Sequence, residues 1–190
     1  MEILFYLSSG FLVLFIILAT FDGVYLHLWK YELFRRKESR FEHLTHTARA
    51  LLFPLIVWTV FLNETSTVGF LVGIALILVD TLILGIDAYS EAESRSFMGG
   101  LPKWEYIVHL FSNAFHFTVI VLVLTAKLQV LDGALYMVTG PISGNAYGLF
   151  ITIAQQLMPG AILMALLHLF LAHKSGHRFW NTYRIKLQCC

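Results

Sequence analysis

Four polar residues near position 110 recur at the spacing of a single helix face. They are Glu105, His109, Ser112 and His116, separated by four, three and four residues. Residues three or four apart lie on the same side of an α-helix, so these side chains form one stripe. The stripe extends roughly 16 Å along the helix, at about 1.5 Å per residue. A carboxylate and two imidazoles in one line are suited to binding a metal ion or to moving protons.

A second stripe, made of acids, precedes the first in the sequence. Asp80, Asp87 and Glu91 are separated by seven and four residues, which again places them on one helix face. We expect Asp80 at the depth of His116, and the other two acids near the level of His109. Carboxylates that face imidazoles can hold a divalent cation, for which imidazole suits iron, zinc or copper. The same pairing would also serve a proton relay.

Two further histidines stand at the start of an apolar segment. His43 and His46 share a helix face, and His46 lies four residues after Glu42. Ser39 and Glu42 also have the spacing of a capping box, which gives Glu42 a structural alternative to ligand binding. His43 has the alternative of lying at the surface. We therefore interpret His46 as the better candidate ligand and keep Glu42 and His43 as further candidates.

An isolated acid lies inside the first apolar segment. An unpaired carboxylate would be strongly disfavoured there, so we expect Asp22 to contact His46, Arg49 or a metal ion. His27 follows five residues later, which on an α-helix is about 140° away, and it is a weaker candidate. His168 is left open between a structural and a functional role. The remaining histidines are expected to be structural: His173 and His177.

Together these residues predict a membrane-embedded metalloenzyme. The expected activity is that of a non-haem iron or di-iron oxidoreductase acting on a lipid or other apolar substrate. Asp22, Glu105 and Ser112 are expected to act in catalysis. The expected metal ligands are His46, His109, His116, Asp80, Asp87, Glu91, Glu42 and His43. Soluble di-iron bundles also place carboxylates on each of four helices, but with Glu-x-x-His where this chain has Glu-x-x-x-His.

Other functions fit the same residues. A zinc-dependent lipid hydrolase would use three histidines, an acid and Ser112 to activate water. A haem-binding electron carrier would need two histidines that face each other at equal depth. A cation or proton transporter would need polar residues that continue to the far face, where the chain has isolated acids at Glu2, Glu64 and Asp132. A non-catalytic subunit of a membrane complex would use the polar layer for packing alone.

The elements that position these residues are expected to be membrane-spanning helices. Of the 190 residues, 58% are hydrophobic and 13% are charged, which is too apolar for a soluble domain of this size. Five apolar segments reach the ~20 residues that cross a hydrocarbon core. They lie at about 3–28, 47–63, 67–88, 105–126 and 146–171. We predict an all-α integral membrane protein, a single polytopic domain whose first four spans form a bundle around a polar layer.

Basic residues set the expected orientation. Lysine and arginine gather after the first span, between the third and fourth, and after the fifth, whereas Lys127 falls on the other side. By the positive-inside rule, the N-terminus is outside and the C-terminus is cytoplasmic. The polar layer would then face the cytoplasm, in a bacterial inner membrane or, in a eukaryote, in an endomembrane.

Composition also restricts the cofactors and partners. The two cysteines, Cys189 and Cys190, end the chain, so no cysteine metal site is expected. No polybasic, aromatic-rich surface indicates nucleic-acid binding. The expected partners are the lipid bilayer and an apolar or lipid substrate, with an oligomer or a larger membrane complex left open. Iron is the favoured metal, and zinc or haem are the alternatives.

Overall fold

The structure, a computed structural model, describes residues 1–138 and 142–188. Within these residues, five helices are long and apolar enough to cross a membrane, which confirms the predicted number of spans. They are Glu2–Lys30, Arg40–Phe61, Thr67–Met98, Lys103–Lys127 and Asn145–Leu171. Cys189 and Cys190 lie outside the described residues.

Several spans contain more than one type of helix. The elements of the first two spans are α1 (Glu2–Thr20), the π-helix η1 (Phe21–Lys30), α2 (Arg40–Ile56) and the π-helix η3 (Val57–Phe61). Those of the other three are α3 (Thr67–Ser94), the 3-10 helix η4 (Ser96–Met98), α4 (Lys103–Lys127) and α5 (Asn145–Leu171). A 3-10 helix, η2 (Leu33–Arg35), links the first two spans, and α6 (Lys174–Gln188) follows the last.

The second and third spans are longer than hydropathy alone predicts. α2 begins at Arg40 rather than near residue 47, and α3 continues to Ser94 rather than ending near residue 88. The added turns carry Glu42, His43 and Glu91, all of which are buried. Because these polar side chains face the interior of the bundle, the helices continue beyond the apolar segments of the sequence.

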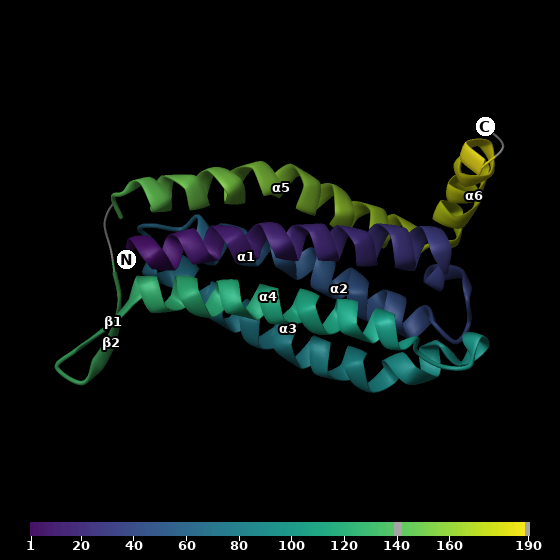
Figure 1. The fold of residues 1–190 in the computed structure, drawn as a ribbon, viewed down its shortest axis with the longest axis horizontal. Coiled ribbons are helices and arrows are strands. Elements are labelled where there is room, and N and C mark those ends of the chain that lie inside the picture. Colours follow the sequence, from purple (N-terminus) through teal and green to yellow (C-terminus); the bar gives the residue numbers. More distant parts are fainter. Residues whose placement is uncertain (139–141, 189–190) are drawn as a thin grey trace.

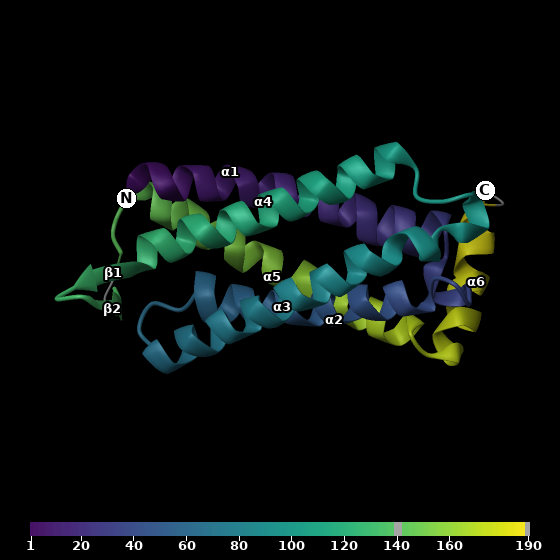
Figure 2. The same cartoon turned by 90° about the horizontal axis from the view of Figure 1, so that it is seen from below.

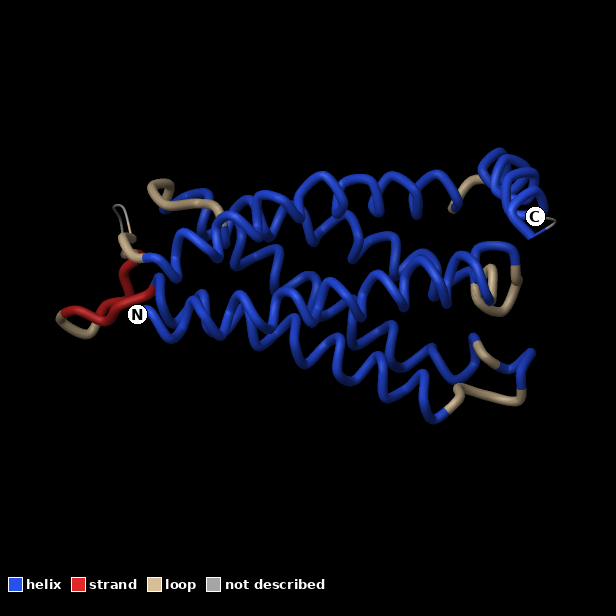
Figure 3. The backbone as a smooth tube through the Cα atoms, turned by 45° about the horizontal axis from the view of Figure 1, so that its top comes forward, coloured by secondary structure: helices blue, strands red, loops and turns tan. Residues whose placement is uncertain are grey.

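A short β-hairpin departs from the predicted all-helical fold. β1 (Leu128–Leu131) pairs antiparallel with β2 (Ala134–Met137) directly after α4 (Figure 3). Asp132 and Gly133 form the turn and both have positive φ, as a type I′ turn requires. The all-α prediction is therefore wrong for this segment, whose Asp-Gly pair is a hairpin signal in the sequence.

The spans form two packed pairs that α5 joins. α1 packs against α4, α2 packs against α3, and α5 contacts both α1 and α2 (Figures 1 and 2). The fifth helix thus belongs to the bundle together with the four that the sequence predicts. The N-terminus and the hairpin lie at one end of the long axis, and α6 turns across the opposite end (Figure 2).

The apolar core fills the half of the bundle nearest the N-terminus and the hairpin. Every span contributes almost inaccessible side chains to this core. One example from each span, in chain order, is Phe5, Val60, Phe70, Val123 and Phe150. Apart from Lys127, the buried charged and imidazole groups gather in the other half, between η1 and the beginnings of α2 and α4. The site described below occupies this polar half.

Candidate metal centre

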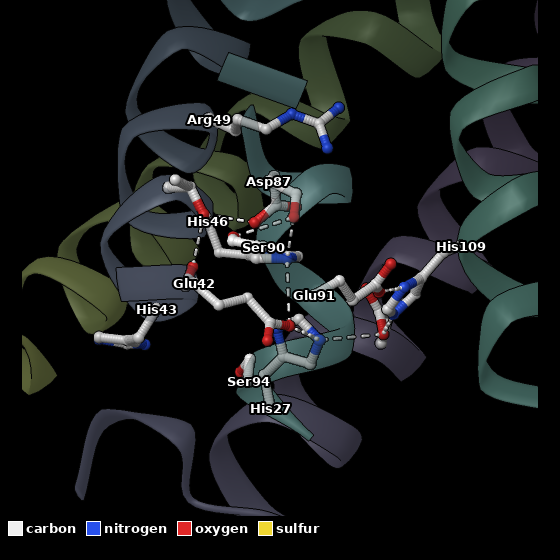
Figure 4. Close-up of polar contacts among 12 residues, drawn as sticks. His27, Glu42, His43, His46, Arg49, Asp87, Ser90, Glu91, Ser94 and His109 are labelled. Carbon is white, nitrogen blue, oxygen red and sulfur yellow. Dashed lines mark hydrogen bonds and ion pairs between the residues drawn. The ribbon is translucent and has the colours of Figure 1, made fainter. Parts of the chain in front are cut away.

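Eight acidic and imidazole side chains from four spans meet in the polar half of the bundle. We name this set the acid–histidine cluster, and its members are Asp22, His27, Glu42, His46, Asp87, Glu91, Glu105 and His109. Figure 4 shows Glu42, His46 and Asp87 to one side and Glu91 with His109 to the other. All of them except His27 are candidate site residues from the sequence.

Asp22 and His27 lie on the same face of η1 because this segment is a π-helix. A π-helix joins residues five apart by hydrogen bonds, so residues i and i+5 point the same way. Asp22 Oδ1 is 3.3 Å from His27 Nε2, and His27 is fully buried. The predicted separation of about 140° between the two residues, made for an α-helix, is therefore wrong, and His27 lies among the candidate ligands.

His109 stands between two carboxylates from different helices. Its Nε2 lies 2.9 Å from Asp22 Oδ1, and its Nδ1 contacts Glu91 Oε1. The contact with Glu91 confirms the predicted match in depth between the stripes on α3 and α4. It also connects the two packed helix pairs across the interior of the bundle.

His46 occupies the corresponding position on the side of α2 and α3. Its Nε2 is 3.1 Å from Asp87 Oδ2 and 3.9 Å from Glu42 Oε1. The Thr45 hydroxyl donates a hydrogen bond to Asp87 Oδ1, which fixes the orientation of this carboxylate. The ring centroids of His27 and His46 are 4.1 Å apart, so the two sides of the cluster meet at His27.

A buried arginine closes the cluster at its loop end. Arg95 follows α3 and is fully inaccessible, with Nη1 2.5 Å from Glu42 Oε2 and Nη2 2.6 Å from Glu105 Oε1. From the sequence it counts only as a cytoplasmic charge, and its place in the site results from the added length of α3. The predicted capping box is wrong, because the Ser39 hydroxyl donates to the Ser94 carbonyl oxygen and Arg95 binds Glu42.

Tyr31 covers Arg95. The centroid of its ring is 5.4 Å from the guanidinium carbon of Arg95 and 4.9 Å from Lys30 Nζ. Burial raises the pKa of the Tyr31 hydroxyl, so this group stays neutral beside the cluster at physiological pH. An aromatic ring next to a guanidinium adds cation–π stabilisation and limits the access of water.

A second set of polar side chains lies deeper in the bundle. We name it the inner polar group, and its members are Arg49, Asp80, Asn113 and His116. Arg49 Nε donates to Asp80 Oδ1 over 3.1 Å, and Asp80 Oδ2 is 3.2 Å from His116 Nε2. Arg49 also donates to the Asn113 side-chain oxygen over 3.0 Å. The predicted facing of Asp80 and His116 is confirmed by their contact.

Asp80 and His116 do not belong to the acid–histidine cluster. Each lies seven residues from a member of the cluster, Asp87 on α3 and His109 on α4. Seven residues correspond to roughly 10 Å along a helix at 1.5 Å per residue. The prediction of one ligand set that includes Asp80 and His116 is corrected by this separation into two layers.

The predicted ligand His43 is directed to α5 instead. Its ring is stacked on that of His168 with centroids 5.4 Å apart, and its Nε2 lies 3.2 Å from the His168 carbonyl oxygen. Figure 4 shows His43 pointing away from Asp87 and His109. His168, whose role the sequence leaves open, is buried beside Gly23 and faces the cavity described below. His43 therefore packs behind the cluster.

Several potential ligand atoms of the cluster are buried without a hydrogen-bond partner. Among the described residues, they include His27 Nδ1, Glu42 Oε1 and Glu105 Oε2. The ligand atoms of Asp22, His27 and His46 lie within 4.8 Å of one another, and so do those of His27, Glu105 and His109. Unpaired buried polar atoms are costly, and a cation among them would remove that cost.

A cavity of about 350 Å³ adjoins the cluster. Members of the acid–histidine cluster line one part of it and the inner polar group lines another, so that the cavity connects the two layers. Much of the remaining wall is apolar and includes Phe15, Phe53 and Met164. Ser112, predicted to act in catalysis, also faces this space. The cavity can admit a small or slender apolar molecule that reaches both polar layers.

The chain was compared with known proteins at the level of sequence and of structure. No protein-family model, curated protein or solved structure matches it.

Proposed function

We propose that this protein is a membrane-embedded metalloenzyme, a non-haem iron oxidoreductase that acts on a lipid or other apolar substrate. The observation that carries the proposal is the convergence of His27, His46 and His109 from three spans on shared carboxylates beside a cavity. Ionisable groups are expensive inside a membrane bundle, and their concentration in one place is characteristic of a functional site.

The donor set supports iron. The acid–histidine cluster offers imidazole nitrogens and carboxylate oxygens, the combination used by non-haem iron oxygenases and di-iron bundles. Zinc accepts the same donors and remains the metal of the alternative hydrolase. A haem group is less favoured, because the ring centroids of His27 and His46 are only 4.1 Å apart and carboxylates occupy the space around them.

The cavity supports an apolar substrate that enters from the bilayer. Phe15, Ile16 and Leu84 contribute to its wall. Ala88 and Gly160 also line it, and both are accessible. Their small size would leave room for lateral entry between the spans. A substrate placed in this way would present its chain to the apolar wall and its reacting atoms to the cluster.

The distribution of charge supports an orientation with the cluster near the cytoplasm. Exposed basic residues such as Arg36, Lys37 and Lys103 lie at the end of the bundle that holds the acid–histidine cluster. Lys127, the basic residue at the opposite end, is buried and caps a helix, so it adds no surface charge there. By the positive-inside rule, the N-terminus would lie outside. The membrane would be a bacterial inner membrane or an endomembrane.

Different residues of the site would have different roles in the reaction. When bound, iron would supply Lewis acidity and one-electron chemistry. Asp87 and Glu91 each contact a histidine of the cluster, so they would hold the rings in place and accept protons near the cavity. Arg95 would position Glu42 and Glu105. The inner polar group would orient a polar atom of the substrate through hydrogen bonds.

Elemental analysis of the detergent-purified protein, combined with an optical spectrum, tests the proposal. We expect stoichiometric iron, visible absorption that changes on reduction, and dioxygen uptake with apolar substrates. His109→Ala should lose the iron. His116→Ala is the matched control, since it changes the same residue type on the same helix within the inner polar group, and it should retain the iron.

Each other result has a distinct meaning. Protein without stoichiometric metal would overturn the proposal, as would loss of iron in neither variant. Zinc with a colourless protein would replace the oxidoreductase by the zinc-dependent hydrolase. A Soret band would replace it by the haem-binding electron carrier.

A further inference from the structure

We infer that the acid–histidine cluster holds two divalent cations, one on each side of His27. The inference rests on the proposed function, because it takes the cluster to be a metal centre and adds the number of ions. Three independent features of the cluster lead to it, namely its charge, the placement of its ligand atoms and its unpaired buried oxygens.

With its histidines neutral, the cluster contains more negative charge than Arg95 balances. Its five carboxylates are those of Asp22, Glu42, Asp87, Glu91 and Glu105, and they meet the single guanidinium of Arg95. With histidines that are neutral, as metal ligands must be, four negative charges remain. A buried excess of this size inside a membrane is strongly unfavourable. Two divalent cations cancel it, whereas one leaves half of it in place.

The inner polar group provides the contrast. Its carboxylate, Asp80, forms an ion pair with Arg49 at 3.1 Å, so its charges cancel without a cation. Both layers use α2, α3 and α4, and both line the same cavity. The need for cations is therefore specific to the outer layer and does not follow from burial alone.

Two sets of ligand atoms can be assigned to the two packed helix pairs, which are close enough that the ligand atoms of Asp22 and His46 lie within 4.8 Å of each other. On the side of α2 and α3, His46 Nε2 lies 3.1 Å from Asp87 Oδ2 and 3.9 Å from Glu42 Oε1. On the side of η1 and α4, His109 Nε2 lies 2.9 Å from Asp22 Oδ1. Each set thus has one imidazole and one carboxylate from a neighbouring helix, and Glu42 adds a carboxylate from the helix of His46 itself. Such a set is the start of a coordination sphere.

His27 and Glu91 connect the two sets. His27 Nε2 is 3.3 Å from Asp22 Oδ1 and 3.7 Å from Glu42 Oε1, one carboxylate from each side. Glu91 belongs to α3 and contacts His109 on α4. Paired metal ions in proteins lie about 3.5–4 Å apart, so their ligand sets must also lie close together. The contacts of His27 and Glu91 hold the two sets at such a short separation.

Each side also keeps one buried oxygen that has no hydrogen-bond partner. On the side of α2 and α3 it is Glu42 Oε1, and on the side of η1 and α4 it is Glu105 Oε2. Both residues are at most 1% exposed, and in both the other oxygen is held by Arg95. Arg95 therefore fixes the two carboxylates so that one oxygen of each is free for an ion.

Counting bound Mn²⁺ tests the inference without reference to activity. The full chain, purified in detergent and stripped of metal with a chelator, is titrated with Mn²⁺ while electron paramagnetic resonance measures the free ion. We expect two Mn²⁺ per chain, and a spectrum of the loaded protein that shows coupling between neighbouring ions.

Asp87→Asn and Asp80→Asn form a matched pair, because they make the same change on one helix two turns apart. Asp87→Asn should bind one Mn²⁺ and lose the coupling, whereas Asp80→Asn should still bind two. Asp22→Asn, on the other side of the cluster, should also bind one. Gel filtration and thermal unfolding show whether each variant keeps the fold, and only folded variants are counted.

The outcomes separate this inference from the proposed function. One Mn²⁺ per chain with an uncoupled spectrum would overturn the second ion and leave a metalloenzyme with one ion. No bound Mn²⁺, together with no metal in the protein as purified, would overturn both. Equal loss in Asp87→Asn and Asp80→Asn would overturn the assignment of one ion to each side.

Discussion

Asp22 and His27 face each other within one turn of a π-helix, with Asp22 Oδ1 3.3 Å from His27 Nε2. On an α-helix the same two residues would point about 140° apart. The wider turn brings His27 close to two other histidines. Its ring centroid is 4.1 Å from that of His46 and 5.8 Å from that of His109. The geometry of one short segment therefore decides whether the first span provides an imidazole to the site.

His27→Ala should weaken metal binding at least ~10-fold, the lower end of the loss seen when groups that support a metal ligand are removed. The physical reason is that His27 is central to the cluster and contacts carboxylates from both sides. Competition between the protein and a chelator for Mn²⁺ gives the affinity. His173→Ala, an exposed histidine after α5, is the control and should bind Mn²⁺ as the unchanged chain does. Equal affinities in both variants would remove His27 from the site.

Arg95→Met should lower the free energy of unfolding by about 3–5 kcal/mol, because it leaves two buried carboxylates without their counter-charge. Arg95 contacts both Glu42 and Glu105 and has no exposed surface. Unfolding in mixed micelles with increasing denaturing detergent gives the value. Arg35→Met removes an exposed ion pair with Glu32 and should cost less than about 1 kcal/mol. Similar losses of unfolding free energy in the two variants would contradict the role of Arg95 as the buried counter-charge of Glu42 and Glu105.

Lys127→Met should destabilise the fold by about 1–3 kcal/mol, the cost of leaving buried polar groups unpaired. Lys127 Nζ donates to the carbonyl oxygens of Val60, Phe61 and Asn63 at 2.8, 2.9 and 2.7 Å, at the end of the second span. Val60 and Phe61 end η3, and the last carbonyl oxygens of a helix lack a partner within it. Lys103→Met, an exposed lysine at the start of α4, should leave thermal unfolding almost unchanged. No difference in melting temperature between the two variants would contradict the capping role.

Cysteine labelling should show that the β-hairpin and the loop after η2 lie on opposite sides of the membrane. In a chain whose Cys189 and Cys190 are replaced by serine, Asp132→Cys should react with an impermeant maleimide on intact cells. Lys37→Cys should react only after the cells are opened. Both positions are exposed in the fold, so the difference reports the membrane alone. The reverse pattern would place the acid–histidine cluster at the outer face and overturn the proposed orientation.

The sequence by itself determines the spans and the two main polar stripes. Apolar runs long enough to cross a membrane are local properties of the chain, and five such helices are present in the described residues. Helical spacing also places Asp80 at the depth of His116 and Glu91 near that of His109, because residues on one face of an α-helix keep their relative depth. The contacts between these pairs confirm the match in depth.

Only the tertiary structure decides which of these groups form one site. His27 enters because the pitch of η1 changes, and Arg95 enters because α3 continues past its apolar segment, two features that hydropathy does not record. Asp80 pairs with Arg49 and His43 stacks on His168, so neither belongs to the cluster. These contacts depend on neighbours that are distant in sequence. Periodicity fixes the face and the depth of a side chain, whereas its partner is set by the packing of helices against one another.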